Sequence, residues 1–474
     1  MDIHIYDTKR RTKRRFEPLN ADHVKIYVCG PTVYDRIHIG NGLSAVVFDV
    51  FVRVLRAVFK NVTYVRNVTD IDDKINARAL ELRIPIDELT RDCTDAMHED
   101  FEALGVLLPD VEPKATGHIN EIVTMISSLI QQGHAYEAEG HVLFYVPSDP
   151  NYGSLTNKSL EDLIDGARIE VAPYKKDPKD FVLWKPSSSE LPGWESPWGR
   201  GRPGWHIECS AMIREHLGNE IDIHGGGTDL AFPHHENEMA QSGCFNDNPD
   251  YVKYWMHNGM LNLGAQKMSK SLGNIQTVQE LLEDHAGETL RYAILSGHYR
   301  QSLKWDDELI AQSDRSLTSL YQALRNAERI AGESSTSDAY AQIRSADLPE
   351  EILGPLCDDL NTPRALAGMH ELASRLNIST DSSEASSLRD KLLGGGWLLG
   401  LLTRSVAEFF TQDANLTELE IDRLIEERAQ AKATKQYHRA DEIRTELLAN
   451  GIAIEDTRNG TIWKVVKKTV SETR

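Results

Sequence analysis

The chain has 474 residues, of which 40% are hydrophobic and 26% are charged. These proportions are ordinary for globular proteins, so they exclude a chain that is mainly disordered or fibrous, and the length predicts roughly three domains. The formal net charge of −21 argues against a protein that coats nucleic acid without specificity. No apolar run approaches the roughly 20 residues that a membrane-spanning helix needs.

Cysteine usage and the N-terminal residues favour a reducing compartment. The five cysteines are an odd number and are scattered along the chain, at positions 29, 93, 209, 244 and 357. That spacing is not typical of a disulfide framework, so thiols remain free for a metal ion. The N-terminal residues lack the apolar stretch of a secretory signal. We therefore expect a cytoplasmic protein.

Basic residues are concentrated in two places. Six of the seven residues at positions 9–15 are basic, and residues 428–474 hold ten basic and six acidic residues. Local basic patches on an acidic protein suit one specific polyanion, whereas a solvated charged surface is the more common meaning of such runs. Both interpretations stay open at this point.

The first part of the chain predicts a parallel sheet. Residues 23–29 form an apolar, β-branched run that Gly30-Pro31 ends, and we expect a second strand at residues 62–68. Between them, over residues 42–59, apolar residues recur at the three- and four-residue spacing of a helix. Strand, helix and strand in this order indicate a βαβ unit.

Later segments predict an irregular middle and a helical second half. A helix at 119–132 and a strand at 141–146 precede an irregular Pro- and Gly-rich connection over 184–204. We expect strands at 205–209 and 221–224, the second ending in three glycines. Helices are then expected at 309–330, 350–377 and 387–410, with two more within 416–450. A linker is expected near 332–338 and a β-like ending at 460–470.

The segment His38-Ile39-Gly40-Asn41 lies between the first strand and the first helix. A helix N-terminus offers free backbone N–H groups and a positive dipole end, both suited to phosphate. Gly40 lets a ligand approach the backbone, and the side chains of His38 and Asn41 can donate hydrogen bonds to phosphate oxygens. The alternative is a polar helix start of the kind found in any α/β protein.

A second phosphate-binding candidate is Lys267-Met268-Ser269-Lys270-Ser271, which stands between two glycines in a stretch without helical or strand pattern. Two lysines on a glycine-flanked loop can form a mobile clamp on phosphates. An exposed basic turn is the alternative.

Four further residues have the chemistry of a metal shell. His234 and Glu238 are four positions apart at the start of a predicted helix and face the same way, whereas His235 has no such partner. Cys29 ends the first strand and Cys209 a later one, and the carboxyl ends of parallel strands share one crevice. Sulfur and nitrogen donors suit zinc. Two buried cysteines beside a surface turn are the alternative.

Longer words surround these candidates at residues 27–35 (YVCGPTVYD), 64–74 (YVRNVTDIDDK), 201–210 (GRPGWHIECS) and 224–238, which contains HGGGTDL and FPHHENE. The segments HIGN and KMSKS resemble the two signature motifs of class I aminoacyl-tRNA synthetases. The longer words resemble those of the cysteinyl-tRNA synthetase family. The resemblance extends to the C-terminal Ile454-Glu455-Asp456-Thr457 and so covers nearly the whole chain.

The resemblance implies a cysteine–tRNA ligase, which activates cysteine with ATP and transfers it to tRNA(Cys). It implies one zinc ion per chain, held by Cys29, Cys209, His234 and Glu238, and a magnesium ion that accompanies ATP. Zinc prefers a thiolate to a hydroxyl, so it would separate cysteine from serine, which a purely apolar pocket does poorly.

The resemblance also implies roles for single residues, through their match to family motifs. The catalytic residues would be His38, Asn41, Lys267 and Lys270. ATP would contact His38, Gly40, Asn41, Gly227, Asp229 and Lys270. The amino acid would meet Gly30, Thr69, Trp205 and His224. The tRNA would meet Lys432, Tyr437, Asp441 and Asp456.

The tRNA contacts also have support from composition. Lys432, Lys435 and Arg439 are predicted on a helix within the basic C-terminal segment, and Tyr437 could stack on a base. A solvated helix with a half-buried tyrosine is the alternative.

Together, these observations predict an α/β fold, with a Rossmann-type parallel-sheet catalytic domain that carries an insertion, followed by an α-helical C-terminal half. The Rossmann domain would comprise residues 1–115 and 201–265, with a connective insertion at 116–200. A KMSKS loop and stem-contact region would follow at 266–315, a helical bundle at 316–403 and an anticodon-binding domain at 404–474.

Two other functions stay open. A related ligase could join cysteine to an amino-sugar, but such enzymes lack the C-terminal region, which this chain has. A non-catalytic, zinc-stabilised RNA-binding paralogue would be expected to have lost a motif lysine or a zinc ligand, and none is missing. We expect no membrane or DNA partner, and a monomer, because no heptad repeat or long apolar stripe is present.

Overall fold

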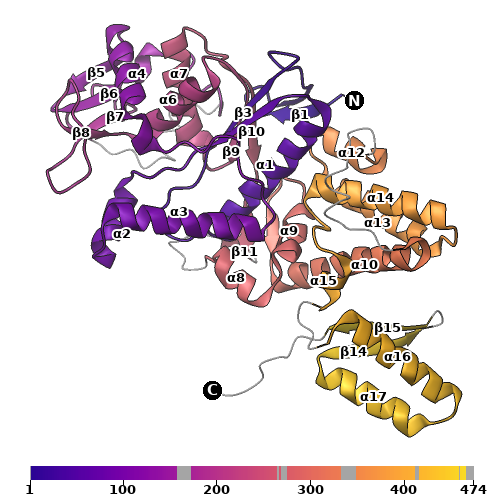
Figure 1. The fold of residues 1–474 in the computed structure, drawn as a ribbon. Helices are drawn as coiled ribbons and strands as arrows, with labels where there is room; N and C mark the ends of the chain where they lie inside the picture. Colours follow the sequence, from indigo (N-terminus) through magenta and orange to yellow (C-terminus); the bar gives the residue numbers. More distant parts are fainter. Residues whose placement is uncertain are drawn as a thin grey trace. The chain divides into compact units, whose positions relative to one another are not determined.

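The computed structural model describes residues 2–156, 172–263, 266–267, 275–332, 348–411, 416–457 and 460–465 (Figure 1). The chain forms two compact units. The first comprises Met1–Leu317, Arg344–His370 and Gly394–Leu401, and the second comprises Thr318–Ile343, Glu371–Leu393 and Leu402–Arg474. Among the described residues, no helix is both long and apolar enough to cross a membrane.

A four-stranded parallel sheet forms the centre of the first unit. Its strands are β3 (Val24–Val28), β4 (Val62–Arg66), β9 (Ile221–Gly227) and β10 (Val252–Asn258), in the order β10-β9-β3-β4. Helix α1 (Ile39–Val58) connects β3 to β4, and its apolar face is fully buried. The predicted βαβ unit and the parallel sheet are confirmed.

The insertion after the first βαβ unit has its own antiparallel sheet. Helix α4 (Ile119–Gln131) precedes β5 (Ala135–Ala138), β6 (His141–Phe144), β7 (Phe181–Pro186) and β8 (Gly201–Pro203), paired in this order. The prediction of an irregular connection over 184–204 is therefore wrong at both ends. The strands were hidden because β8 is three residues of Gly, Arg and Pro, and it gains its ladder only by pairing with β7.

Residues 205–209 were predicted as a strand, but they begin helix α6 (Trp205–Leu217). The alternation of apolar Trp205, Ile207 and Cys209 with polar residues imitates the period of a strand. Burial does not follow this alternation, however, because the polar Glu208 is buried while the apolar Trp205 is exposed. Polarity therefore does not report exposure here, and Cys209 is contributed by a helix instead of a strand end. Helix α7 (Glu236–Asn246) follows β9 after the single-turn segment Ala231–His235.

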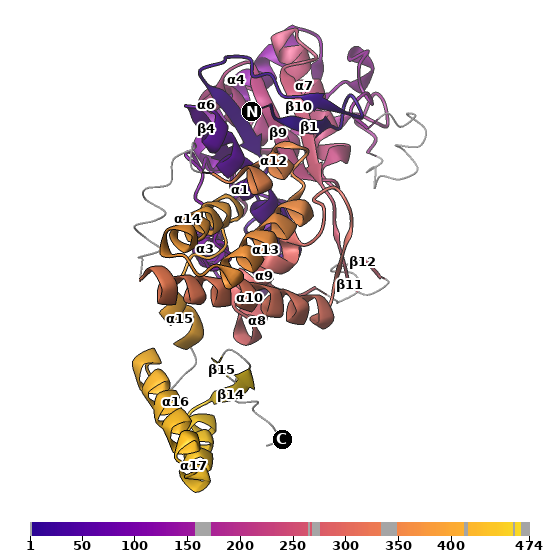
Figure 2. The same cartoon turned by 90° about the vertical axis from the view of Figure 1, so that its right-hand side faces the viewer.

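Strand β9 continues through the three glycines that were predicted to end it. A Cβ atom on Gly225 would lie 2.3 Å from the ring of Phe48 in α1, so only glycine lets the helix pack this closely on the sheet. The remaining elements of the sheet's surroundings are β1 (His4–Asp7), β2 (Thr12–Arg15), α2 (Asp73–Leu82), α3 (Ile86–Ala103), α8 (Val278–Asp284), α9 (Gly287–Leu295) and α12 (Glu350–Cys357). A small sheet pairs β11 (Leu261–Leu263) with β12 (Gln266–Lys267) and β13 (Leu303–Trp305) (Figure 2).

The N-terminal basic run lies on the β1–β2 hairpin, and carboxylates compensate five of its six basic residues. Lys9 and Arg10 pair with Asp250, and Lys13 pairs with Asp358. Arg14 and Arg15 pair with Asp7 and Asp2. Of the two interpretations of this run, the ion-paired surface is the one that the structure supports.

Three helices contribute residues to both units: α10 (Asp307–Ala331), α13 (Thr362–Ile378) and α14 (Ser382–Leu399). The helix predicted over 350–377 is divided, because Asp359 and Leu360 have left-handed φ angles of 63° and 51° between α12 and α13. The helix predicted over 387–410 is also divided, since Gly400 with φ 64° follows α14 and α15 (Val406–Thr411) begins later. The predicted linker lies outside the described residues except for Gly332.

The C-terminal part of the second unit contains the two predicted helices. They are α16 (Glu418–Ala433) and α17 (Tyr437–Ala449), which lie side by side and are followed by the antiparallel strands β14 (Ile452–Thr457) and β15 (Gly460–Val465) (Figures 1 and 2). The predicted β-like ending is confirmed as far as Val465, and residues 466–470 lie outside the described part of the chain.

Candidate functional site

A pocket of about 530 Å³ opens at the carboxyl ends of the parallel strands. It receives residues from the loop after β3, the start of α1, the end of β9 and the segment after β10. The lining includes several of the predicted site residues: Cys29, Gly30, His38, Gly40, Asn41, Trp205, Gly227 and Asp229. The carboxyl edge of such a sheet is the usual place for a ligand.

His38 and Asn41 form a reciprocal cap at the start of α1. The backbone N–H of Asn41 donates to His38 Nδ1 at 3.2 Å, and the backbone N–H of His38 donates to Asn41 Oδ1 at 3.1 Å. Because Nδ1 accepts, the Nε2 atom of His38 carries the proton of the neutral ring and is a donor. A Cβ atom on Gly40 would lie 2.9 Å from His38 Nδ1, so a side chain there would disturb the cap.

The second phosphate-binding candidate is described only in part. The backbone of Lys267 ends the short strand β12. Lys270 and the rest of the KMSKS loop lie outside the described residues.

Four side chains converge at the inner end of the pocket. Cys29 follows β3, Cys209 lies in the first turns of α6, His234 precedes α7 and Glu238 lies in the first turn of α7. One donor atom from each lies within 4.8 Å of the others. The two Sγ atoms are 3.8 Å apart, and His234 Nε2 lies 3.6 Å from Cys29 Sγ and 3.7 Å from Cys209 Sγ. Glu238 Oε1 lies 3.5 Å from Cys29 Sγ and 2.8 Å from His234 Nε2.

Neighbouring side chains fix the orientation of this cluster. His234 Nδ1 lies 2.9 Å from His206 Nδ1, and the ring of His234 stacks on Trp205 at 4.2 Å between centroids. Glu238 Oε2 accepts from His224 Nε2 at 3.0 Å. Partners of this kind hold metal ligands in position. Trp205 lines the pocket beside the cluster, while His224 is fully buried and binds Glu238.

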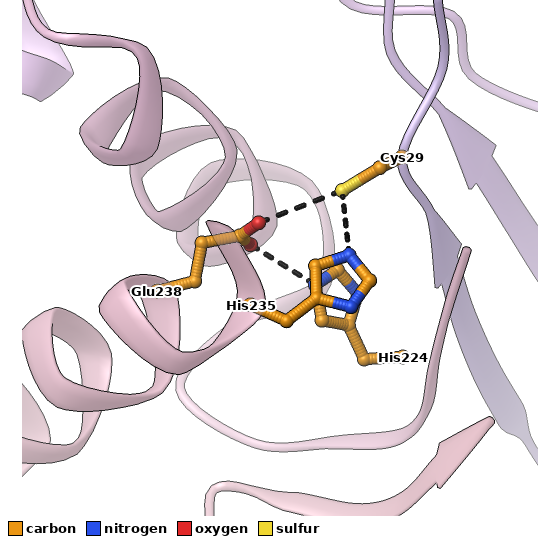
Figure 3. A group of neighbouring side chains, drawn as sticks. All are labelled: Cys29, His224, His235 and Glu238. Carbon is orange, nitrogen blue, oxygen red and sulfur yellow. Dashed lines mark hydrogen bonds and ion pairs between the residues drawn. The ribbon is translucent and has the colours of Figure 1, made fainter. Parts of the chain in front are cut away.

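A second group of potential ligands consists of Cys29, His224, His235 and Glu238 and shares two residues, Cys29 and Glu238, with the first (Figure 3). His235 Nε2 lies 3.3 Å from Cys29 Sγ, and His235 Nδ1 lies 2.8 Å from His257 Nε2. The spacing argument gave His235 no role, because its i+4 neighbour is Met239. That argument considered partners on one helix, whereas the partners of His235 come from the ends of β3 and β10.

Electrostatics keep anionic donors in the cluster. A hydrogen bond from the Cys29 thiol lowers the pKa of Cys209 to about 6, although burial opposes this. Burial and the neighbouring Cys209 raise the pKa of Cys29, so the pair shares one proton on Cys29. Burial disfavours the charged form of His234, but Glu238 outweighs it and raises the His234 pKa to about 10. A thiolate and a carboxylate are therefore available to a cation.

Of the four residues predicted to meet the amino acid, Gly30 and Trp205 line the pocket. A Cβ atom on Gly30 would lie 1.7 Å from the backbone oxygen of Asn67, so no other residue fits. Thr69 is buried beneath the same loop, where its backbone oxygen accepts from Val33 N at 3.2 Å.

The residues predicted to meet tRNA lie in the second unit. Lys432 and Arg428 both bind the carboxylate of Asp456, at 2.6 and 2.8 Å, which holds the pKa of Asp456 well below its usual range. Tyr437 begins α17 with 62% of its surface exposed. The prediction that Lys432, Lys435 and Arg439 share one helix is wrong. Lys432 lies in the last turn of α16, and Arg439 lies on α17. Lys435 stands between the two helices with a left-handed φ of 61°, which does not continue a helix.

Comparisons with known proteins cover nearly the whole chain. Residues 15–315 match the family model of the tRNA synthetases class I (C) catalytic domain, residues 355–403 match the DALR domain and residues 416–463 match the cysteinyl-tRNA ligase anticodon binding domain. The cysteine–tRNA ligase of Rhodospirillum rubrum is 53% identical over 98% of this chain and 100% of its own length. That of Parvibaculum lavamentivorans is 51% identical, with 98% of each chain covered.

Solved structures agree at the level of the fold. The methionyl-tRNA synthetase of Mycobacterium tuberculosis in complex with methionyl-adenylate has a TM-score of 0.54 and 14% identity, covering 80% of this chain and 89% of its own. An arginyl-tRNA synthetase structure from Campylobacter jejuni has a TM-score of 0.52 and 13% identity, covering 82% and 94%. The fold, the motif order and the full-length relatives place the chain in one family: it belongs to the cysteine–tRNA ligases of class I.

Proposed function

We propose that this chain activates L-cysteine with ATP to cysteinyl-adenylate and transfers the cysteinyl group to tRNA(Cys). The observation that carries the proposal is the buried cluster of two sulfurs, one nitrogen and one oxygen at the inner end of a pocket whose other residues suit a nucleotide. A site that selects a thiol and a site that binds ATP thus open into one cavity.

The donor set supports zinc at Cys29, Cys209, His234 and Glu238. In a tetrahedral zinc site two sulfurs lie roughly 3.8 Å apart, and sulfur and nitrogen roughly 3.6 Å apart, as follows from the usual bond lengths. Here the two Sγ atoms are 3.8 Å apart, and His234 Nε2 lies 3.6 and 3.7 Å from them. The other group of potential ligands, Cys29, His224, His235 and Glu238, has one sulfur in place of two and matches zinc less well. Zinc bound here would supply an acceptor for the thiol of cysteine that the hydroxyl of serine replaces poorly.

The remaining residues orient ATP and stabilise its charge. The backbone N–H groups at the start of α1 and the His38 side chain would bind phosphate oxygens, and Gly227 and Asp229 would meet the ribose. Lys267 and Lys270 would neutralise the leaving pyrophosphate, together with a magnesium ion that accompanies ATP. This division of roles needs little covalent chemistry from the protein, since positioning and charge neutralisation lower the barrier.

The alternative in which cysteine is joined to an amino-sugar has less support. The match of residues 416–463 to an anticodon binding domain and the full-length relatives both favour tRNA as the acceptor.

The direct test is ATP–pyrophosphate exchange with each amino acid in turn, followed by charging of total tRNA. We expect exchange with cysteine far above exchange with serine, and charging of a single tRNA species that accepts cysteine. Exchange that is equal for cysteine and serine would contradict thiol selection. Exchange with cysteine but no charging would favour the amino-sugar ligase.

We further expect Tyr437→Ala to weaken tRNA binding. The exposed ring offers a surface for base stacking, which is typically worth about 1–3 kcal/mol per base, or roughly 5- to 150-fold in affinity. The measurement is the tRNA concentration dependence of charging, with Tyr437→Phe as the matched variant that retains the ring. Equal tRNA affinity in both variants would remove Tyr437 from the interface.

A further inference from the structure

One end of the pocket takes no part in the contacts proposed for zinc and ATP. The strand order β10-β9-β3-β4 puts residues that follow β9 and β10 on one side of β3 and residues that follow β4 on the other. The nucleotide residues Gly227 and Asp229 follow β9. The other side, which we call the α2 end, is lined by Lys74 and Phe101, which follow β4. Tyr34, Asp35 and Arg36 from the loop after β3 also line it, and contacts of Tyr34 with Lys74 and of Arg36 with Asp100 place them there.

Lys74 brings a positive charge to the α2 end without a carboxylate partner among the described residues. The close partner of its exposed ammonium is the ring of Tyr34, 5.7 Å from the centroid. The carboxylates beside it bind elsewhere, because Asp72 accepts the backbone N–H of Lys74 at 2.7 Å and Asp73 pairs with basic side chains of β7 and β8. Lys74 also lies in the first turn of α2, where the helix dipole disfavours a cation, so helix stability does not explain it.

Other cations near the site are already compensated. Arg36 has the carboxylate of Asp100 at 3.4 Å, and the exposed Asp35 accepts the backbone N–H of Arg36 at 3.0 Å. Arg66, which also lines the pocket, has the carboxylate of Glu112 at 3.6 Å. Lys74 therefore stands out as the described cation of this pocket with which an incoming anion can pair.

We propose that Lys74 and Tyr34 bind the single-stranded 3′ end of the tRNA, Lys74 at a phosphate and Tyr34 against a base. The inference rests on the proposed function, in which the terminal ribose of the tRNA must reach the cysteinyl carbonyl between the metal cluster and the nucleotide residues. The α2 end offers the tRNA an approach that is not lined by the residues assigned to ATP. A cation beside an aromatic ring is the usual pairing for single-stranded nucleic acid.

The test separates the two half-reactions. Lys74→Met removes the charge and retains most of the side-chain length, while Lys74→Arg restores a cation. In Lys74→Met the ratio of tRNA charging efficiency to pyrophosphate exchange should fall about tenfold, the scale of a lost charge-assisted hydrogen bond, and Lys74→Arg should recover it. The slope of log affinity for tRNA against log salt concentration should decrease in magnitude by about 0.7, as expected for one contact to a single strand.

Arg78→Met is the matched control, because Arg78 lies one turn further along α2, pairs with Glu81 and does not line the pocket. In Arg78→Met, the ratio of tRNA charging to pyrophosphate exchange and the salt dependence of tRNA binding should equal those of the unmodified protein. Tyr34→Leu should lower the ratio and Tyr34→Phe should not.

Two results would overturn the inference. An equal loss of exchange and charging in Lys74→Met would assign Lys74 to ATP, and an unchanged ratio and salt slope would remove it from substrate binding. Neither result resembles a failure of the proposed function itself, in which the unmodified protein would show no cysteine-dependent exchange.

Discussion

Replacing Cys209 by serine should remove bound zinc and lower the efficiency of cysteine activation by at least about a hundredfold, since even the outer partners of metal ligands act on a scale of 10- to 100-fold. Cys209 supplies one of two sulfur donors that stand 3.8 Å apart, and its thiolate is the form favoured in the folded protein. A serine hydroxyl is a poor ligand for zinc and stays protonated, so the four ligands would lose one negative charge and one polarisable sulfur donor. Because thiol selection depends on this ion, discrimination against serine should collapse as well.

Metal analysis of the purified protein and pyrophosphate exchange with cysteine and serine measure these effects. Cys244→Ser is the matched control, because Cys244 is partly buried but lies outside both potential ligand groups. It should retain one zinc per chain and normal selectivity. Full zinc content and unchanged selectivity in Cys209→Ser would contradict the assigned ligand set.

The fold could be predicted where one physical signal dominates. Strand β3 is mainly apolar and buried, β4 is buried over its last three residues, and α1 carries its apolar residues at helical spacing. The predictions were wrong where contacts with other elements, and not the local pattern, determine the secondary structure. Residues 205–209 alternate like a strand, yet they form the first turns of α6, and β8 gains its ladder by pairing with β7.

The candidate site shows the same division. Cys29, Cys209, His234 and Glu238 could be proposed from their chemistry and from the family resemblance. His235 could not, because its contacts with Cys29 and His257 depend on how β3, β10 and α7 meet. Lys74 ends the motif at residues 64–74, and its position in the sequence alone indicates no role for it. Its significance depends on which neighbouring carboxylates are already occupied, and that information exists only in three dimensions.

A second large effect is expected from Asp49→Ala, which should destabilise the first unit by roughly 3–5 kcal/mol, the usual cost of removing one partner from a buried ion pair. Asp49 on α1 is 1% exposed and binds two arginines, Arg53 at 2.9 Å and Arg291 of α9. Its other oxygen accepts the backbone N–H of Leu107 at 2.8 Å. The arginines in turn donate to backbone oxygens of residues 104, 105, 397 and 399, so one carboxylate holds four segments together.

Without Asp49, two buried guanidinium groups face each other with no counter-charge. The midpoint of urea unfolding should therefore fall sharply, whereas Asp250→Ala should change it little, since Asp250 also binds two cations but is 54% exposed.

Burial alone would raise the pKa of Asp49, but Arg291 and Arg53 outweigh it and lower that pKa. A carboxyl with a lowered folded-state pKa contributes its stability above its unfolded pKa of about 3.9 and loses it as the pH falls further. The difference in stability between the unmodified protein and Asp49→Ala should thus be full at neutral pH and shrink in strong acid. If Asp49→Ala lost no more stability at neutral pH than Asp250→Ala, the two arginines would have found other partners. The apolar face of α1 would then position this helix alone.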